Sequence, residues 1–352
     1  MHDTIDGLEE IRALAGQFAA DRLRPNVERW DHDRAIDAEV LDELGQLGFH
    51  GMLAPESHGG LAFGAPTFAA VVEQLAWGEP AVAFRLLASC IAATALGSAT
   101  DDAKTRWLEA LAAGSVTGAI PLSRRDGLRA LRQGDGWTVD GSIGWVLRGE
   151  TSLLVTHAAT DQGRAVFCVP LDAAGITVTR REDTLGLRSA TIESLELKGV
   201  ALPDSTRLAS TSSALQVVEC TGTAAIAAGI ARAALEYAIA YADEREQFGR
   251  RIRQFQGVRM KLADMKVRVD AAAAMVREAA VAGSHAAAAG SRVFASESAM
   301  WVTTQAVQIF GGYGYMRDYP VEKLMRDAKA TELLAHTNEA LRETVAAALY
   351  PN

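Results

Sequence analysis

The sequence is short of several residue types, and each shortage excludes a class of protein. It has three cysteines in 352 residues, Cys90, Cys168 and Cys220, and no CxxC pair, which excludes a disulfide framework and a cysteine-rich zinc site. Its seven histidines show no metal-ligand spacing, so no metal is expected. The 35 lysines and arginines are outnumbered by 44 aspartates and glutamates, and the resulting charge of -9 argues against general affinity for nucleic acid or an anionic membrane.

Long apolar runs are also missing. We find none that reads as a membrane span, and residues 1–11 lack the apolar segment of a signal peptide, so the sequence predicts a cytoplasmic protein. What the chain has in abundance is hydrophobic residues, 49%, against 22% charged and 6% aromatic residues. With its alanine-rich stretches, this composition indicates a soluble, helix-dominated globular protein that has room for two or three domains.

The hydrophobic periodicity changes twice along the chain. Over residues 1–114 apolar side chains recur every three or four positions, which predicts about five or six helices, one of them capped by Asp101. Over 115–204 short apolar runs separated by Gly, Asp and Pro predict a β domain. Helical spacing resumes over 205–352, where residues 258–276 form one apolar stripe. We therefore expect an α+β multi-domain fold with helical, β and helical domains in these three ranges.

Two C-terminal segments have compositions suited to a cofactor. The first, residues 245–256, reads REQFGRRIRQFQ, turns at Gly249 and opens a long helix. Arginines near a helix N-terminus form a natural pyrophosphate site, because guanidinium groups, backbone N–H groups and the helix dipole all attract phosphate. A solvated basic turn between two helices is the alternative explanation.

The second segment, residues 305–315, reads QAVQIFGGYGY and places Gln308 one helical turn before the pair Gly311 and Gly312. Adjacent glycines let the backbone approach a flat ligand closely, and a glutamine amide can bond a ring or a ribose. By itself the same glycine pair also suits the end of a helix.

Together these segments resemble the C-terminal domain of acyl-CoA dehydrogenases, whose motifs read R-x-Q-F-G, F-Q, Q-x-x-G-G-x-G-Y, R-D-A and E-G-T-N-E. The resemblance spans residues 235–349, and weaker similarity at 47–60 and 186–195 extends it over most of the chain. It implies an N-terminal helical domain, a middle β-barrel-like domain, a C-terminal four-helix bundle and FAD as the cofactor. The cofactor-binding residues that the motifs carry over are Arg245, Gln247, Phe248, Ile252, Phe255, Gln256, Gln308, Ile309, Gly311, Gly312 and Thr337.

The resemblance also implies a reaction. In the family a carboxylate removes the α-proton of an acyl-CoA thioester, the β-hydrogen leaves as hydride to the flavin, and electrons pass to an electron-transfer flavoprotein. The usual base is the glutamate of E-G-T, but Ala335 stands there, followed by His336. Some members carry the base on a central helix, at a spacing that points to Glu219, although Cys220 replaces the arginine expected next. Glu219 is thus the candidate base, an ordinary helical glutamate is the alternative, and His336 is a second candidate acid or base.

Two departures concern the flavin ring. The β-domain motif T-E-P is lost, with Leu122 in its place, and W-I-T is reduced to Trp145, Val146 and Leu147. In the family the β domain and E-G-T hold the ring within one subunit, whereas R-x-Q-F-G and Q-x-x-G-G come from its neighbour. Because the donated motifs are intact and the ring-side motifs are not, the leading hypothesis is a subunit of an α2β2 heterotetramer that completes the FAD site of a homologous partner.

In this respect the chain resembles the smaller subunit of actinobacterial heterotetrameric steroid side-chain acyl-CoA dehydrogenases, which makes a steroid acyl-CoA a candidate substrate. Three alternatives stay open. The chain is a self-sufficient homotetrameric dehydrogenase that uses Glu219, a catalytically inactive structural subunit, or a relative of oxygen-using flavin enzymes of related fold.

Overall fold

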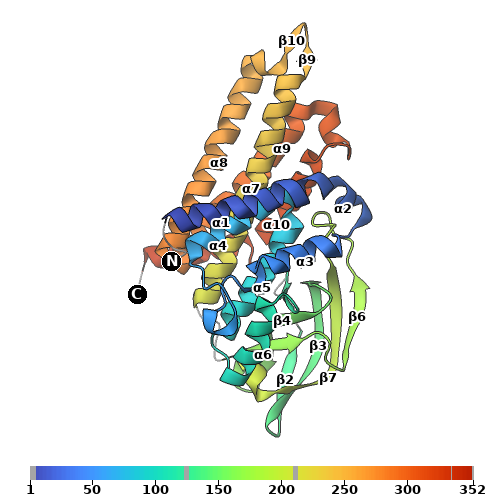
Figure 1. Ribbon diagram of the computed structural model, residues 1–352, viewed down its shortest axis with the longest axis vertical. Helices are drawn as coiled ribbons and strands as arrows, with labels where there is room; N and C mark the ends of the chain where they lie inside the picture. Colours follow the sequence, from blue (N-terminus) through green and yellow to red (C-terminus); the bar gives the residue numbers. More distant parts are fainter. Residues whose placement is uncertain (1–4, 123–126, 209–212, 334, 351–352) are drawn as a thin grey trace.

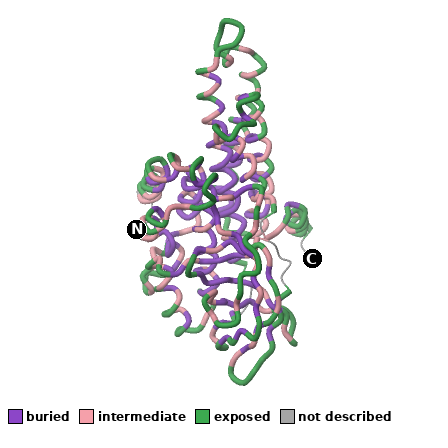
Figure 2. Tube along the Cα trace, turned by 90° about the vertical axis from the view of Figure 1, so that its right-hand side faces the viewer, coloured by how far each residue is buried: buried purple, intermediate pink, exposed green. Residues whose placement is uncertain are grey.

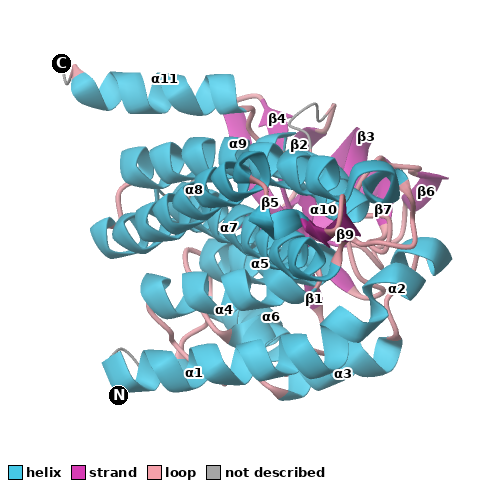
Figure 3. Ribbon diagram, turned by 90° about the horizontal axis from the view of Figure 1, so that it is seen from above, coloured by secondary structure: helices cyan, strands magenta, loops and turns pink. Residues whose placement is uncertain are grey.

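The structure is a computed structural model that describes residues 5–122, 127–208, 213–333 and 335–350. Helices, then a sheet, then longer helices follow one another along the chain, which confirms the expected fold class. The sheet lies at one end of the molecule, and the C-terminal helices run from it to a hairpin at the opposite end (Figure 1). Seen from above, α11 and the N-terminal helix α1 lie on opposite sides of these central helices (Figure 3).

The N-terminal helices provide one side of the core. Two of them are buried nearly throughout, because apolar residues occur on all their faces. The helices are α1 (Ile5–Phe18), α2 (Val27–Asp33), α3 (Ala38–Gln46), α4 (Ala65–Gly78), α5 (Pro80–Leu96) and α6 (Asp101–Ala112), and the two buried ones are α4 and α5. Thr100, rather than Asp101, caps α6, since its hydroxyl accepts the Ala103 N–H at 3.4 Å and Asp101 begins the helix.

The middle part, within the described residues, is an eight-stranded mixed sheet in the order β6-β7-β3-β1-β4-β5-β8. Its strands are β1 (Thr117–Pro121), β2 (Arg129–Gln133), β3 (Gly136–Leu147), β4 (Ser152–Thr160), β5 (Gly163–Pro170), β6 (Ile176–Arg181), β7 (Ile192–Pro203) and β8 (Arg207–Leu208). Strand β2 pairs with both β3 and β4, which curls that part of the sheet toward a barrel. Trp137 and Phe167 meet edge to face inside it, with ring centroids 5.5 Å apart.

The C-terminal part is a bundle of long helices. Its elements are α7 (Ser213–Glu244), β9 (Glu246–Gln247), β10 (Arg250–Arg251), η6 (Ile252–Gln254), α8 (Gln256–Ala282), α9 (His285–Phe310), η7 (Gly311–Tyr315), α10 (Val321–Leu333) and α11 (Asn338–Leu349). Strands β9 and β10 form the hairpin between α7 and α8. On α8 the predicted apolar stripe is core at Met265, Val269 and Val276, which are buried.

Helix α7 is the central helix of the core. Among the described helices it is the one that is long and apolar enough to cross a membrane, so the expectation that no such run exists was wrong. However, 83% of its most apolar stretch is buried inside the protein, where it packs against α4, α5 and α9. The same burial appears in Figure 2, where the central helices are buried and the hairpin end is exposed. The hydrophobicity of α7 therefore serves the core.

A buried ionic cluster joins the three parts of the chain. Lys323 on α10 donates to Glu79 at 3.0 Å and to Asp327 at 2.6 Å. Asp327 accepts the Leu187 N–H at 2.6 Å, and Glu79 accepts the Ser189 hydroxyl at 3.0 Å. Burial raises the pKa of Glu79, which Lys323 partly opposes; burial alone would lower the pKa of Lys323, but its two carboxylate partners raise it. The aspartate of the R-D-A motif thus holds the domains together.

Candidate functional site

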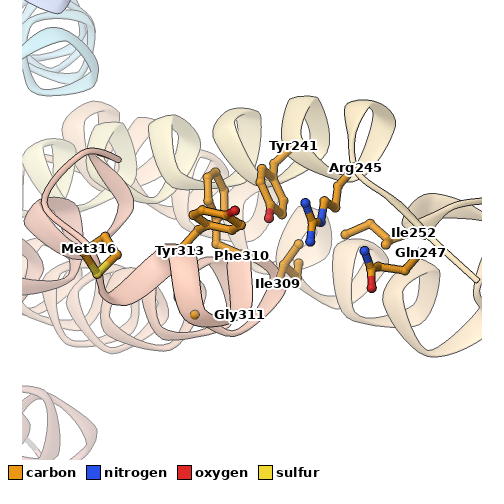
Figure 4. A pocket seen from close by; sticks show the side chains of 10 residues that line it. Tyr241, Arg245, Gln247, Ile252, Ile309, Phe310, Gly311, Tyr313 and Met316 are labelled. Atoms are coloured by element: carbon orange, nitrogen blue, oxygen red, sulfur yellow. The ribbon is translucent and has the colours of Figure 1, made fainter.

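A cavity of about 540 Å3 opens beside the β9–β10 hairpin, between the end of α7 and η7 (Figure 4). The hairpin folds the chain back after α7, and α9 delivers the glycine pair to the same place. Segments about sixty residues apart in sequence therefore share one wall. Six residues assigned to the cofactor from the sequence line it: Arg245, Gln247, Ile252, Ile309, Gly311 and Gly312.

The cavity has the charge and the space that the pyrophosphate part of FAD requires. The Arg245 guanidinium lies 5.4 Å from the Tyr313 ring centroid, and in the described chain its side chain forms no hydrogen bond or ion pair. Gly311 has a φ of 62°, and a Cβ on Gly311 or Gly312 would meet no atom within 4 Å. The described residues contain no group of three or more His, Cys, Asp or Glu side chains that could hold a metal ion.

An aromatic wall completes this cavity, and sequence reasoning missed it. Tyr241 stacks on Phe310 with ring centroids 4.0 Å apart and planes inclined by 15°, and Tyr313 and Met316 lie beside them. Burial raises the pKa of Tyr241, while the charge of Arg245 opposes the rise. Tyr241 precedes Arg245 by four positions, so helical periodicity could have placed both on one face; Met316 follows a turn and had no such signal.

The remaining assigned residues lie outside the cavity wall. Phe248, at the hairpin tip, has a φ of 53° and is 92% exposed, and its ring meets Phe255 edge to face at 6.2 Å. Gln256 begins α8, Gln308 is exposed on α9, and Thr337 caps α11 by accepting the Ala340 N–H at 3.4 Å. The Phe248 side chain is therefore exposed to solvent and is not buried in a pocket of this chain.

Glu219 is buried on α7, next to the loop that carries Ala335 and His336. Its Oε1 accepts a hydrogen bond from Arg292 at 3.3 Å and lies 3.9 Å from His336 Nε2. Arg292, on α9, is fully buried and also donates to the His336 carbonyl at 2.9 Å. The fold thus brings the two candidate base positions together. Arg292 was missed, although an arginine within an apolar, alanine-rich helix is a signal of a buried ion pair.

The segments expected to face the flavin ring also lie together. The Leu122 N–H donates to the Trp145 carbonyl at 2.8 Å, and the Ala335 N–H donates to the Leu122 carbonyl at 3.2 Å. Trp145 is 53% exposed, whereas Leu147 is fully buried. The rest of the altered motif, residues 123–126, lies outside the described residues. The three segments expected at the ring are therefore joined by backbone hydrogen bonds, but Leu122 and Leu147 offer a ring no polar side chain.

The fold has an arginine- and glycine-lined cavity on the helical bundle and a buried glutamate on the central helix. These features together are those of a flavoprotein dehydrogenase. Family models for the N-terminal and C-terminal domains of acyl-CoA dehydrogenases match residues 6–115 and 213–350. The short-chain specific acyl-CoA dehydrogenase of Megasphaera elsdenii is 33% identical over 94% of each chain. The chain belongs to the acyl-CoA dehydrogenase family of FAD-dependent oxidoreductases.

Solved structures agree over nearly the whole length. The butyryl-CoA dehydrogenase of Megasphaera elsdenii superposes with a TM-score of 0.91 at 31% identity, covering 99% of both chains. A chain of the structure reported as the electron transferring flavoprotein of Acidaminococcus fermentans superposes with a TM-score of 0.93 at 32% identity, again over 99% of both chains. The fold is therefore shared along the entire chain, including the middle sheet.

Proposed function

We propose that this chain acts in the FAD-dependent α,β-dehydrogenation of an acyl-CoA thioester as one subunit of a heterotetramer. The observation that carries the proposal is that the ring-side segments offer no polar side chain at Leu122 and Leu147, while the cavity at Arg245 keeps its predicted lining. The separation of these two half-sites supports a cofactor shared between subunits, whether the subunits are identical or not. Glu219 and Arg245 lie toward opposite ends of α7, about 40 Å apart along the axis at 1.5 Å per residue. Arg245, Gln247 and Ile252, at or next to the β9–β10 hairpin, line the cavity. The hairpin lies at the end of the molecule remote from the sheet (Figure 1). A single FAD in this chain cannot touch both, so the cofactor is shared between subunits.

The partner, in this proposal, is a homologous subunit that is not identical to this chain. The side chains of Leu147, which is fully buried, and Leu122 cannot hydrogen-bond a flavin ring, whereas Arg245 and the glycine pair line a cavity that can accept a pyrophosphate. A partner with intact T-E-P and W-I-T motifs would hold the ring, and FAD, when bound, supplies the hydride acceptor. Because the chain resembles the smaller subunit of heterotetrameric steroid side-chain acyl-CoA dehydrogenases, steroid side-chain CoA esters are the first substrates to test.

We infer further that an electron-transfer flavoprotein receives the electrons and that the assembly works in the cytoplasm. The similarity to a chain of the Acidaminococcus fermentans structure supports the first inference. The exposed Trp145 also supports it, because this ring lies at the surface beside the ring-side segments. The acidic, cysteine-poor composition supports the cytoplasmic location.

A self-sufficient enzyme is the second candidate, and the position of Glu219 favours it. The carboxylate lies beside the loop in which the family carries its usual base, and Arg292 fixes its orientation. In that case Glu219 takes the α-proton of the substrate. The same ion pair is also what a purely structural glutamate would form, so activity has to decide.

The absorbance of bound flavin separates these candidates. We expect the chain expressed alone to be colourless, and co-expression with a homologous subunit that carries the ring-side motifs to restore about one FAD per pair of chains. One FAD per single chain, with acyl-CoA turnover lost in Glu219→Gln but kept in the surface control Glu278→Gln, refutes the heterotetramer and establishes the second candidate. A chain that binds neither flavin nor this partner contradicts both candidates and favours a catalytically inactive member of the family.

A further inference from the structure

A second cavity, of about 420 Å3, lies between the N-terminal helices and the sheet. Helices α3 and α5, the turn between β3 and β4, and the starts of β1 and β7 contribute to its wall. No residue assigned to the cofactor or to catalysis lines it, and its volume falls in the range of small-molecule sites. Its charged and titratable lining residues are Asp42, His50, Arg85, Arg148, Glu150 and Arg181.

Arg85, on α5, has a guanidinium group without an acceptor. In the described chain its side chain forms no hydrogen bond and no ion pair, and Glu150 acts on it only as a nearby charge. Arg85 is half-buried, and burial lowers the pKa of its guanidinium group. Gly149 makes this placement possible, since a Cβ there would lie 2.9 Å from Arg85 Nη2. The N–H donors of Arg85 are not used by the described part of the protein and lie in the wall of the cavity, where the oxygens of a ligand can accept them.

The other two arginines of the wall are already engaged. Arg148 donates to Glu193 at 2.5 Å, and Arg181 donates to the Arg34 carbonyl at 3.0 Å. Arg85 is therefore the cation of this cavity that is free to recognise a ligand.

His50 supplies a second unused donor. Its side chain is buried, and Nδ1 lies 3.1 Å from the Ser89 hydroxyl, which accepts the Gly118 N–H at 2.9 Å. The hydroxyl can donate to Nδ1 at 3.1 Å or to the Arg85 carbonyl at 3.5 Å, and the shorter contact is the one to Nδ1. When the hydroxyl donates to Nδ1, the imidazole proton sits on Nε2, which has no hydrogen-bond partner among the described residues. Burial, and then the charge of Arg85, lower the pKa of His50 to about 4, so the ring is neutral near pH 7. The Thr191 hydroxyl lies in the same wall and is also unbonded.

We propose that this cavity binds a small anion through phosphate or carboxylate oxygens. The planar fork of Arg85 matches two such oxygens, and His50 and Thr191 donate to the same anion from neighbouring positions in the wall. Asp42 and Glu150, in the same wall, repel anions that are large enough to reach them. The site is separate from the FAD cavity and goes beyond the dehydrogenase reaction.

Titration calorimetry with inorganic phosphate and with citrate tests the proposal. We use the FAD-loaded protein in its isolated assembly and match the ionic strength with sodium chloride. We expect saturable binding of at least one probe with a Kd near the millimolar range or below, weakened about tenfold by Arg85→Gln and less by Arg85→Lys. Thr191→Val, which removes one hydroxyl, should weaken it by about threefold. Arg106→Gln, an exposed charge on α6, is the matched control and should leave binding unchanged.

Three results would overturn the proposal. The first is the absence of saturable binding of either probe. The second is equal binding by Arg85→Gln and the wild type, which places the anion elsewhere, for example at Arg245. The third applies if Arg85→Gln fails to fold: unchanged affinity in Thr191→Val then contradicts the site. Comparing the two probes shows whether phosphate or carboxylate is the preferred group.

Discussion

Replacing His50 by glutamine measures how strongly the fold holds this imidazole neutral. Burial, and then the charge of Arg85, lower the pKa of His50 to about 4 from an ordinary value of 6.5. Because the folded pKa is the lower one, the unfolded chain takes up this proton first as the pH falls. The contribution of neutral His50 to the free energy of unfolding is therefore fully present above about pH 6.5, and it is lost as the pH falls toward 4. Linkage gives a loss of roughly 2 kcal/mol by about pH 5 and about 3 kcal/mol by about pH 4.

Urea unfolding of the wild type and His50→Gln at about pH 7.5 and pH 5 tests this. Glutamine does not titrate and can still bond the Ser89 hydroxyl, so the variant should lose roughly 2 kcal/mol less than the wild type between the two pH values. Chloride buffers are needed, because phosphate or citrate bound beside Arg85 would change the result. His32→Gln, on the exposed side of α2, is the control for loss of a histidine. Equal losses in the wild type and His50→Gln would refute the reasoning.

Three further substitutions test the packing and the FAD cavity. Lys323→Met leaves two buried carboxylates without their cation and should cost about 3 to 5 kcal/mol in denaturant unfolding; an unchanged midpoint contradicts this. Gly222→Ala places a Cβ 2.5 Å from a side-chain atom of α5 and should cost about 1 to 3 kcal/mol, seen as a lower melting temperature. Gly312→Ala should leave unfolding within about 0.5 kcal/mol but reduce bound FAD, unlike Gly290→Ala on α9; full FAD retention counts against the cavity assignment.

Local patterns predicted the elements because local energetics create them. The stripe on α8 and the end of α9 at Phe310, just before Gly311, could be predicted from short segments, since helical periodicity and a glycine with positive φ need no distant partner. The N-cap of α6 was misassigned by one residue, because Thr100 and Asp101 are both good capping residues and backbone geometry decides between them. The sequence analysis also overlooked that α7 is long and apolar enough to span a membrane, and the burial of this helix within the protein shows what its apolar residues contact.

The sequence by itself determined the family, the order of helical and β parts, and six residues that line one cavity, because R-x-Q-F-G and the glycine pair each carry their geometry within a few residues. Only the tertiary structure decided which distant side chains meet. Packing α7 against α9 joined Glu219 to Arg292, and packing α5 against the sheet left Arg85 without an acceptor. Such contacts depend on how buried surfaces fit together. The residue pattern of one segment does not show which charged side chain of another segment will contact it.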